Sequence, residues 1–309
     1  MMEKTLFLGN GFSLAVFKDV PSWDELLFPN DKAIKNYPIR YEIGLHNENE
    51  EENKYKEKLS KSLLNLEIRS NVEKLDSISN FGEILKKHNI NNILTTNFDD
   101  GIAYVLVKKC GYSESYKDSS EKTYSIHRYT EYVNNSSKHT VKIWKIHGDV
   151  KNYDTMQLGL NQYGGFLSMI RAYVKGQYTF TEKKETKTCP SIEDKLKNES
   201  LSRISWIDLF FFTDVYIAGF SMSYSEIDIW WLLTRRSRIE FSNIKLQNKI
   251  IYIISKKNNN DDSVKDNKDD DDKSVVRALE SLGVKIEKVI RTDDFLKNMW
   301  EAITRFSHS

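Results

Sequence analysis

The chain has 309 residues, of which 39% are hydrophobic and 29% charged, and its formal net charge is +1. That length suits one large domain or two small ones, and the balanced charge argues against bulk nucleic-acid binding or a polybasic membrane anchor. Only two cysteines occur, Cys110 and Cys189, which excludes a disulfide framework and a four-cysteine zinc site.

The first half of the chain alternates apolar runs with helical patterns. A buried strand is predicted over 4–8, ending in a tight loop at Gly9-Asn10-Gly11. A short amphipathic stretch follows at 22–27. Apolar residues at helical spacing predict two helices between 59 and 87. Next come a strand over 92–97 and a helix from 99 to 107.

The second half continues the alternation. In chain order, the pattern predicts strands over 124–133 and 140–146, helices over 161–173 and 192–212, a strand over 215–218, a helix from Ser225 to Leu233, a strand over 249–254, a helix over 274–282, a strand over 284–290 and a helix over 293–306. Residues 256–273 contain many Asp and Lys and are expected to be disordered, with an acidic interaction loop as the alternative. Residues 181–188 are interpreted as a second exposed insertion.

This alternation predicts an α/β fold with a largely parallel sheet and one domain over 1–309. Ligands of such sheets bind beyond the carboxyl ends of the strands. The apolar run at the start is too short for a signal peptide, and no stretch approaches the about 18 apolar residues of a membrane span. We therefore expect a cytoplasmic protein with no membrane partner.

Four polar or glycine-rich clusters follow predicted strands. Gly9-Asn10-Gly11 would let backbone N–H groups approach a phosphate, or would simply form a tight turn. Asn97, in Thr95-Thr96-Asn97-Phe98-Asp99, could hold a water or a ribose hydroxyl, although Asn97 or Asp99 could equally cap the next helix.

The other two clusters are equally open when taken singly. His147 could accept a proton near neutral pH, and Gly148 would leave room for a ligand beside its ring, but a lone histidine is often structural. Gly219-Phe220-Ser221 precedes a helix, as in a ribose or anion site or an ordinary strand-to-helix turn.

In combination and order, the four clusters resemble the NAD-binding and catalytic core of the sirtuin family, and most closely the zinc-free sirtuin-like domains of bacterial antiphage defence. The resemblance runs from about residue 6 to residue 233 and at its widest reaches residue 254. It implies a Rossmann-like parallel sheet flanked by helices, with NAD+ as the substrate.

The resemblance also implies roles for individual residues. Asn97 and His147 would be catalytic, with Asn97 holding the nicotinamide ribose or the attacking water and His147 serving as the catalytic histidine. Asp99 would contact the nicotinamide amide. The remaining residues implied to bind NAD are Gly9, Asn10, Gly11 and Ser13 at the pyrophosphate and neighbouring ribose, Gly219, Phe220 and Ser221 on the adenosine side, and Thr96 and Asp228.

The departures from the family decide which activity is expected. Protein-deacylating sirtuins carry a zinc ribbon with two cysteine pairs, and no Cys-x-x-Cys exists here. A helical insertion over about 151–212, joined with 47–88 into a helical subdomain, is expected in its place. We therefore expect no metal, and we expect NAD+ glycohydrolase activity in an abortive-infection effector that depletes NAD.

Such an effector must be restrained, so the resemblance implies a homo-oligomer or a separate partner such as a HerA-like ATPase. Trp230 and Trp231 are candidates for an interface or for the core. Two alternative functions remain: a module that senses NAD or ADP-ribose without cleaving it, and, less in keeping with the missing zinc ribbon, an NAD-dependent deacylase. No direct nucleic-acid partner is expected.

Overall fold

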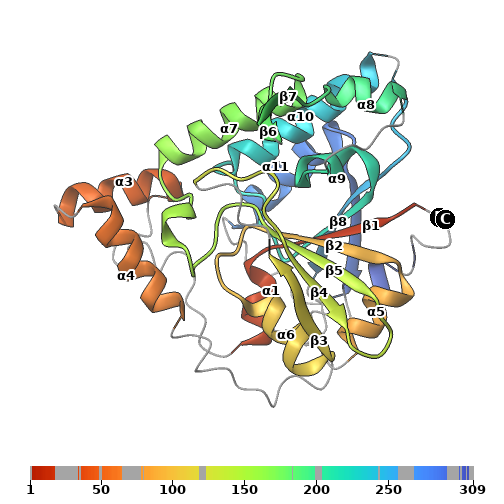
Figure 1. The fold of residues 1–309 in the computed structure, drawn as a ribbon, viewed down its shortest axis with the longest axis horizontal. Coiled ribbons are helices and arrows are strands. Elements are labelled where there is room, and N and C mark those ends of the chain that lie inside the picture. The colour runs from red at the N-terminus through yellow and green to blue at the C-terminus, as the bar shows by residue number, and fades with distance from the viewer. Residues whose placement is uncertain are drawn as a thin grey trace.

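The computed structural model describes residues 2–17, 34, 36–48, 51–64, 78, 80–117, 123–182, 184–198, 204–242, 244–256, 268–290, 299, 301–303 and 305. A mixed sheet forms its centre (Figure 1), with the strand order β10-β9-β8-β1-β2-β5-β4-β3. These strands are β1 (Lys4–Leu8), β2 (Ile90–Thr95), β3 (Tyr112–Lys117), β4 (Thr130–Asn134), β5 (Thr140–Lys145), β8 (Asp214–Ala218), β9 (Ile250–Lys256) and β10 (Lys285–Ile290).

Six of these strands, from β10 to β5 in that order, pair in parallel, and β4 and β3 continue the sheet in antiparallel pairing. Counted along the chain and taken across the sheet from β5 to β10, the parallel strands stand in the order third, second, first, fourth, fifth, sixth. That is the order of a doubly wound, Rossmann-like sheet. The predicted fold class is therefore confirmed.

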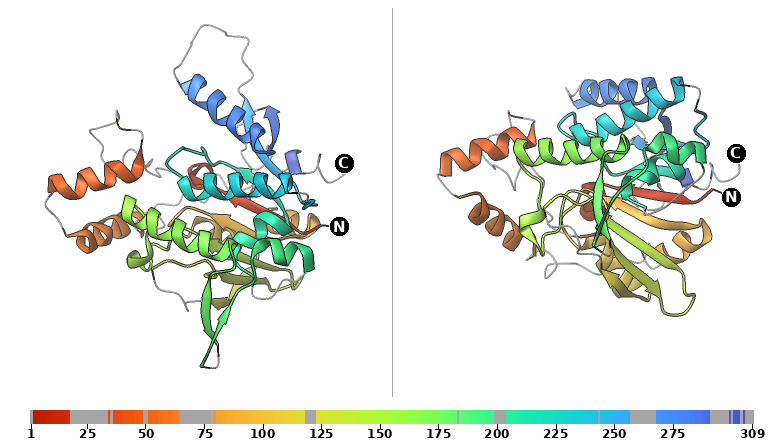
Figure 2. Two further views of the ribbon diagram at one scale, coloured as in Figure 1. Left: turned by 90° about the horizontal axis from the view of Figure 1, so that it is seen from above. Right: turned by 45° about the horizontal axis from the view of Figure 1, so that its top comes forward.

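Helices cover both faces of the sheet (Figures 1 and 2). They are α1 (Asn10–Val16), α3 (Tyr37–Glu48), α4 (Glu52–Leu64), α5 (Phe81–Lys87), α6 (Gly101–Lys109), α7 (Leu160–Val174), α8 (Ile192–Asn198), α9 (Trp206–Phe212), α10 (Ile227–Phe241) and α11 (Lys268–Ser281), with a short 3-10 helix η3 (Tyr153–Thr155). A hairpin of β6 (Thr179–Glu182) and β7 (Glu185–Thr188) projects from the body.

Strand β1 shows why the sheet needs both helical layers. Successive side chains of a strand point to opposite faces, and all of β1 is buried. Phe7 joins the core cluster formed with α7, α9, α10 and α11, whereas Leu6 and Leu8 join the cluster formed with α1, α5 and α6. A strand that is apolar on both sides is typical of a parallel sheet between helical layers.

A third, smaller apolar cluster lies at the side of the sheet. Tyr41 of α3 and Tyr55, Leu59 and Leu63 of α4 pack there against the segment around Met156. Of the helices expected within 47–88, α4 contacts η3, whereas α5 packs on β2 in the main body. The two halves of that segment therefore pack in different places.

Several expected boundaries are wrong, each for a local reason. Helix α1 begins directly at Asn10, so Gly9-Asn10-Gly11 is not a separate loop. Strand β3 was not predicted, because it lies exposed at the edge of the sheet and its polar sequence shows no alternation of buried and exposed residues. Strand β4 begins only at Thr130, later than predicted.

The expected insertions also differ from the structure. The segment 151–212 is not wholly helical, since it contains the β6–β7 hairpin, and 181–188 contributes to that hairpin. Helix α11 begins at Lys268, inside the run expected to be disordered. Residues 257–267, the stretch at 22–27 and most of 293–306 lie outside the described residues.

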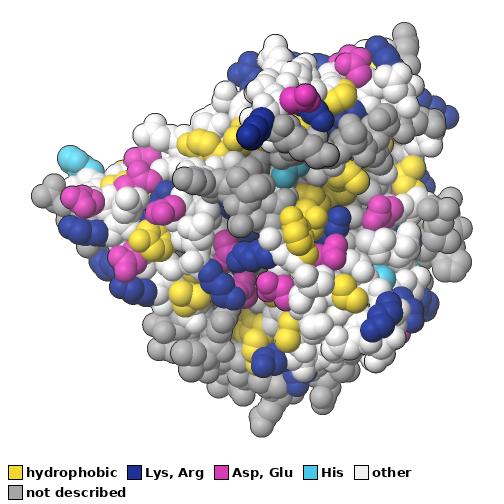
Figure 3. Space-filling model, in the orientation of Figure 1, with side chains coloured by type: hydrophobic (Ala, Val, Ile, Leu, Met, Phe, Trp, Pro, Cys, Tyr) yellow, Lys and Arg dark blue, Asp and Glu magenta, His cyan; other side chains and the backbone are white. Residues whose placement is uncertain are grey.

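The surface agrees with the composition. Figure 3 shows acidic and basic side chains of the described residues interspersed over one face, as a net charge of +1 suggests. None of the described helices combines the length and the apolar character that crossing a membrane requires. Trp230 and Trp231 pack, partly buried, against the core cluster of α7, α9, α10 and α11, which favours the core over the interface interpretation.

Candidate functional site

The four sequence clusters follow β1, β2, β5 and β8, which are neighbours in the sheet. Because these strands run in parallel, all four clusters reach the same carboxyl edge. The strand order changes direction between β1 and β8, and in doubly wound sheets this is where ligands bind. The structure thus brings the predicted clusters to one edge.

The glycines after β1 allow two loops to touch. The N–H of Gly11 donates to the carbonyl of Gly219 at 2.8 Å, and a Cβ at position 9 would lie 2.5 Å from that same carbonyl oxygen. Gly219 itself adopts a left-handed backbone, with φ of 62°. Close packing of the loops therefore explains these glycines, and their contact with a pyrophosphate stays a prediction.

We predict that Gly9→Ala destabilises the fold by about 1–3 kcal/mol, because the added methyl group meets rigid backbone. Gly164→Ala is the matched control: it lies within α7, with no atom within 4 Å of its Cβ position. This control should stabilise the protein by about 0.5–1 kcal/mol through its higher helix propensity. Urea unfolding of both variants measures the contrast, and equal midpoints would contradict it.

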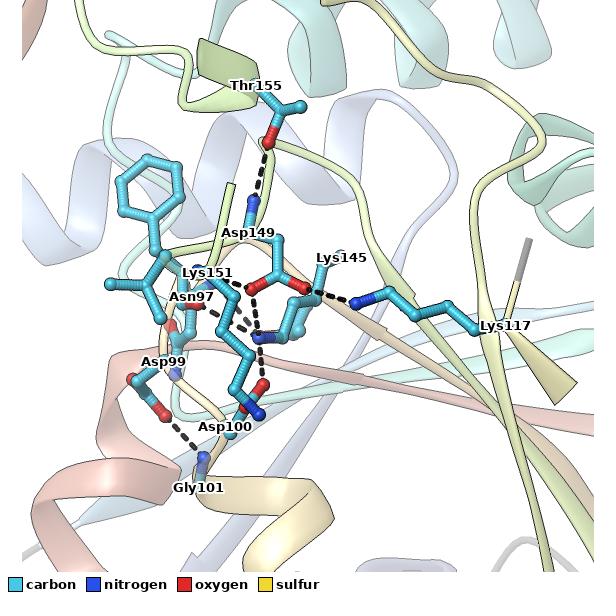
Figure 4. A network of polar contacts seen from close by, with 12 residues as sticks. Asn97, Asp99, Asp100, Gly101, Lys117, Lys145, Asp149, Lys151 and Thr155 are labelled. Atoms are coloured by element: carbon cyan, nitrogen blue, oxygen red, sulfur yellow. Dashed lines mark hydrogen bonds and ion pairs between the residues drawn. The ribbon is translucent and has the colours of Figure 1, made fainter. Parts of the chain in front are cut away.

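Asn97 is held in a buried hydrogen-bond chain. Its amide nitrogen donates to the Gly9 carbonyl at 3.3 Å and to Ser13 Oγ at 3.1 Å. Ser13 in turn donates to the Asp99 carboxylate at 3.1 Å. Asp99 also accepts from the N–H of Gly101 at 2.7 Å, at the start of α6 (Figure 4). Asp99 therefore supports the helix start, while Asn97 is oriented toward the β1–α1 turn.

The electrostatics of Asp99 follow from its position. Burial raises the pKa of Asp99 above its ordinary value, although the Gly101 N–H, the Lys145 charge and Ser13 oppose that rise. Ser13, which follows β1, contacts both Asn97 and Asp99, which follow β2, and so connects the first two clusters.

His147 follows β5 and is 2% exposed. Its Nε2 lies 2.8 Å from a carboxylate oxygen of Asp228, which stands in the first turn of α10 and is fully buried. Burial alone would lower the pKa of His147, but the Asp228 charge and hydrogen bond outweigh it, so the pKa is raised. The second Asp228 oxygen accepts no hydrogen bond within the described part of the chain.

Two residues not identified from the sequence complete the surroundings of His147. Tyr163 Oη, from α7, lies 3.5 Å from Nδ1 and donates to Glu226 Oε2 at 3.2 Å. Glu226 Oε2 is 3.7 Å from Nδ1. Burial raises the pKa of Glu226 to about 7, although His147 opposes the shift. Glu226 stands two residues before Asp228, but nothing in the sequence pattern distinguishes Tyr163 from other helical residues.

A small pocket, open in part to solvent, lies beside His147. Its described lining consists of Tyr37, Thr96, Phe98, His147, Gln157, Leu158, Tyr163 and Glu226. Of the predicted site residues, Thr96 and His147 line it. The pocket therefore combines apolar walls with a histidine, a tyrosine and a carboxyl group, a composition suited to a small polar ligand.

Some of the predicted site positions also have a structural role. Gly148 has φ of 112°, and a Cβ there would lie 2.2 Å from the Thr155 carbonyl oxygen, so Thr155 occupies the room expected for a ligand. The Phe220 ring is buried with its centroid 4.8 Å from that of Phe7. Asn10 is partly exposed and Ser221 is exposed.

A network of charged side chains connects the loops that carry Asn97 and His147 (Figure 4). Lys145, at the end of β5, contacts Asp100, and it donates to Asp149 at 3.2 Å and to the Phe98 carbonyl at 3.0 Å. Lys151 also contacts Asp100. Burial alone would lower the pKa of Lys145, but the charges of Asp149 and Asp100 outweigh burial, so the pKa is raised. The network connects the loop after β2 to the loop after β5.

The donor atoms of His147, Glu226 and Asp228 lie within 4.8 Å of one another. A cation shared by all three would compete with the hydrogen bond between His147 and Asp228. His147, Glu226 and Asp228 thus belong to a hydrogen-bonded cluster, and the absence of a metal requirement stays a prediction.

Comparison with known proteins connects this geometry to a family. A family model described as a SIR2-like domain matches residues 91–267, more than half of the chain. The match contains Asn97, His147 and Gly219, and thus three of the four clusters. No curated protein matches the chain.

Proposed function

Because this chain belongs to the SIR2-like domain family, whose members use NAD+, we propose that it is an NAD+ glycohydrolase that forms nicotinamide and ADP-ribose. The observation that carries the proposal is the buried pair of predicted catalytic residues, Asn97 and His147. They follow neighbouring strands, β2 and β5, at the ligand-binding edge of the sheet.

The chemistry requires little acid catalysis. Cleavage of the nicotinamide–ribose bond builds positive charge on the ribose carbon, as in glycoside hydrolysis, and nicotinamide is already a good leaving group. The site must orient the ribose and supply water. We assign the positioning of the ribose and of the water to Asn97. We assign contact with a ribose hydroxyl or with that water to His147, the catalytic histidine that the resemblance implies.

The proposal extends to the remaining predicted contacts and to biology. Gly9, Asn10, Gly11 and Ser13 would bind the pyrophosphate and the neighbouring ribose. Gly219, Phe220 and Ser221 would contact the adenosine side, and Asp99 the nicotinamide amide. The resemblance in the four motifs supports a cytoplasmic antiphage effector that depletes NAD+. It also supports activation by self-assembly or by a partner such as a HerA-like ATPase.

A second function, sensing of NAD or ADP-ribose without cleavage, is favoured by one observation. The Asn97 amide nitrogen is already bonded to Gly9 and Ser13, and His147 Nε2 is bonded to Asp228. A non-catalytic module could keep both residues for internal structure. Mass spectrometry after incubation with NAD+ distinguishes the two functions, since released nicotinamide indicates the enzyme and bound, intact NAD+ the sensor.

We predict that His147→Ala lowers nicotinamide release by about 10²–10⁴-fold, the usual contribution of a positioned acid–base group. Asn97→Ala should lower it comparably. His46→Ala, at an exposed histidine in α3, is the matched control and should keep parental turnover. The assay is run with and without the product of the neighbouring gene. Parental turnover in both site variants would refute the assignment.

A further inference from the structure

Glu226 is the one carboxylic acid among the described residues that line the pocket beside His147. We propose that Glu226 is the catalytic base that takes a proton from the attacking water, while His147 orients the ribose. This inference rests on the proposed NAD+ hydrolysis, and it assigns separate roles to Glu226 and His147 within that same site.

The position of Glu226 suits this role. It directly precedes α10, and its side chain is 13% exposed, so the carboxyl group reaches the pocket wall without being freely solvated. The hydroxyl of Tyr163 donates to Oε2 at 3.2 Å and restricts its rotation. The same oxygen is 3.7 Å from His147 Nδ1, which places the carboxyl group within reach of a ligand that contacts the imidazole.

The imidazole of His147 is held in place by its neighbours. Its Nε2 is bonded to the buried Asp228 at 2.8 Å, and the neighbouring negative charge raises the pKa of the imidazole. With Nε2 bonded to Asp228, Nδ1 is the ring nitrogen left to contact a ligand, and it lies 3.5 Å from Tyr163 Oη and 3.7 Å from Glu226 Oε2. Held between Asp228 and Tyr163, the imidazole has a fixed orientation, and we assign it the positioning of the ribose.

The groups facing Glu226 come from three elements. They are His147 after β5, Tyr163 on α7 and Asp228 on α10, and Tyr37 of α3 completes the titratable groups of the pocket lining. Burial raises the pKa of Glu226 to about 7. A carboxyl group that loses its proton near neutral pH is a stronger base than an ordinary glutamate and is still ionised in a useful fraction of molecules.

The step balances without a further reactant. A water oxygen forms a bond to the ribose C1′ as the C1′–N bond to nicotinamide breaks. The bonding electron pair leaves with the nicotinamide nitrogen and neutralises its positive charge. One water proton passes to the Glu226 carboxylate, which later releases it to solvent, and the products are nicotinamide, ADP-ribose and a proton.

The test is Glu226→Gln in the full chain, which keeps an oxygen to accept from Tyr163. We expect NAD+ binding, measured by calorimetry, to persist while nicotinamide release falls by about 10²–10⁴-fold. Parental kcat/KM should rise as the pH increases through about 7, because the ionised carboxylate is the active form. The glutamine variant should lose that rise.

Two further variants separate catalysis from folding. Glu240→Gln is the matched control on the same helix; its side chain is 41% exposed beside Arg236, and it should keep parental rates. Glu226→Asp keeps the charge but shortens the side chain, so partial activity with a retained pH dependence is expected even if the glutamine variant is unstable.

The outcomes distinguish this inference from the proposed function. If the parent releases no nicotinamide with or without its neighbouring gene product, NAD+ hydrolysis fails, and the base assignment fails with it. If the parent cleaves NAD+ and folded Glu226→Gln shows the same rate and pH profile, hydrolysis stands and the base assignment is overturned.

Discussion

Replacement of Asp228 by asparagine should lower NAD+ cleavage by about 10²–10⁴-fold, although Asp228 is fully buried and lies behind His147. The carboxylate holds the imidazole through Nε2 and stabilises its protonated form. An asparagine has similar shape but no charge. The imidazole would then lose the charge that anchors it, and its orientation would be less firmly fixed.

The direct readout of this substitution is the titration of His147 by NMR. Asp228 raises the pKa of His147, so Asp228→Asn should lower it. A raised histidine pKa contributes stability that is fully present below the ordinary value of 6.5 and is lost as the pH rises through the higher folded value. The substitution should therefore cost more stability at pH 6 than at high pH.

Asp194→Asn is the matched control for this prediction, because Asp194 is an exposed aspartate near the start of α8. It should leave both NAD+ cleavage and the His147 titration unchanged. An unaltered His147 titration in Asp228→Asn would show that the carboxylate does not govern the imidazole. A changed titration with full turnover would show that catalysis does not depend on this pairing.

Replacement of Asp208 by alanine should destabilise the protein by about 3–5 kcal/mol, because it leaves a buried charge without its partner. Asp208 lies 2.9 Å from Lys195 Nζ, and the two side chains are 1% and 0% exposed. It also accepts from Tyr173 Oη at 2.5 Å and from the Ser205 N–H at 2.7 Å. One carboxylate thus connects α7, α8 and α9.

Urea unfolding measures this loss, with an unchanged slope as the check that the denatured state is comparable. Glu51→Ala is the control: Glu51 pairs with Lys54 at 3.6 Å, but both side chains are largely exposed, so no measurable change is expected. The double variant Asp208→Leu with Lys195→Met removes both charges and should be less destabilised than Asp208→Ala. A loss below about 1 kcal/mol for Asp208→Ala would contradict a desolvated ion pair.

The sequence predicted the central strands well, for a physical reason visible in β1 and β8. Both strands are buried on two sides, so their apolar runs are continuous and end sharply at Gly9 and Gly219. Strand β3 lies exposed at the edge and carries a polar sequence, so local pattern could not reveal it. The hairpin of β6 and β7 escaped prediction for the same reason.

By itself, the sequence determined the alternation of strands and helices and the polar clusters at four strand ends. It thereby determined that Asn97 and His147 would share an edge, because parallel strands end on the same side. Only the tertiary structure decided what those residues touch. Tyr163 and Asp228 lie 16 and 81 positions from His147, and such contacts depend on how α7 and α10 pack on the sheet, which no local pattern encodes.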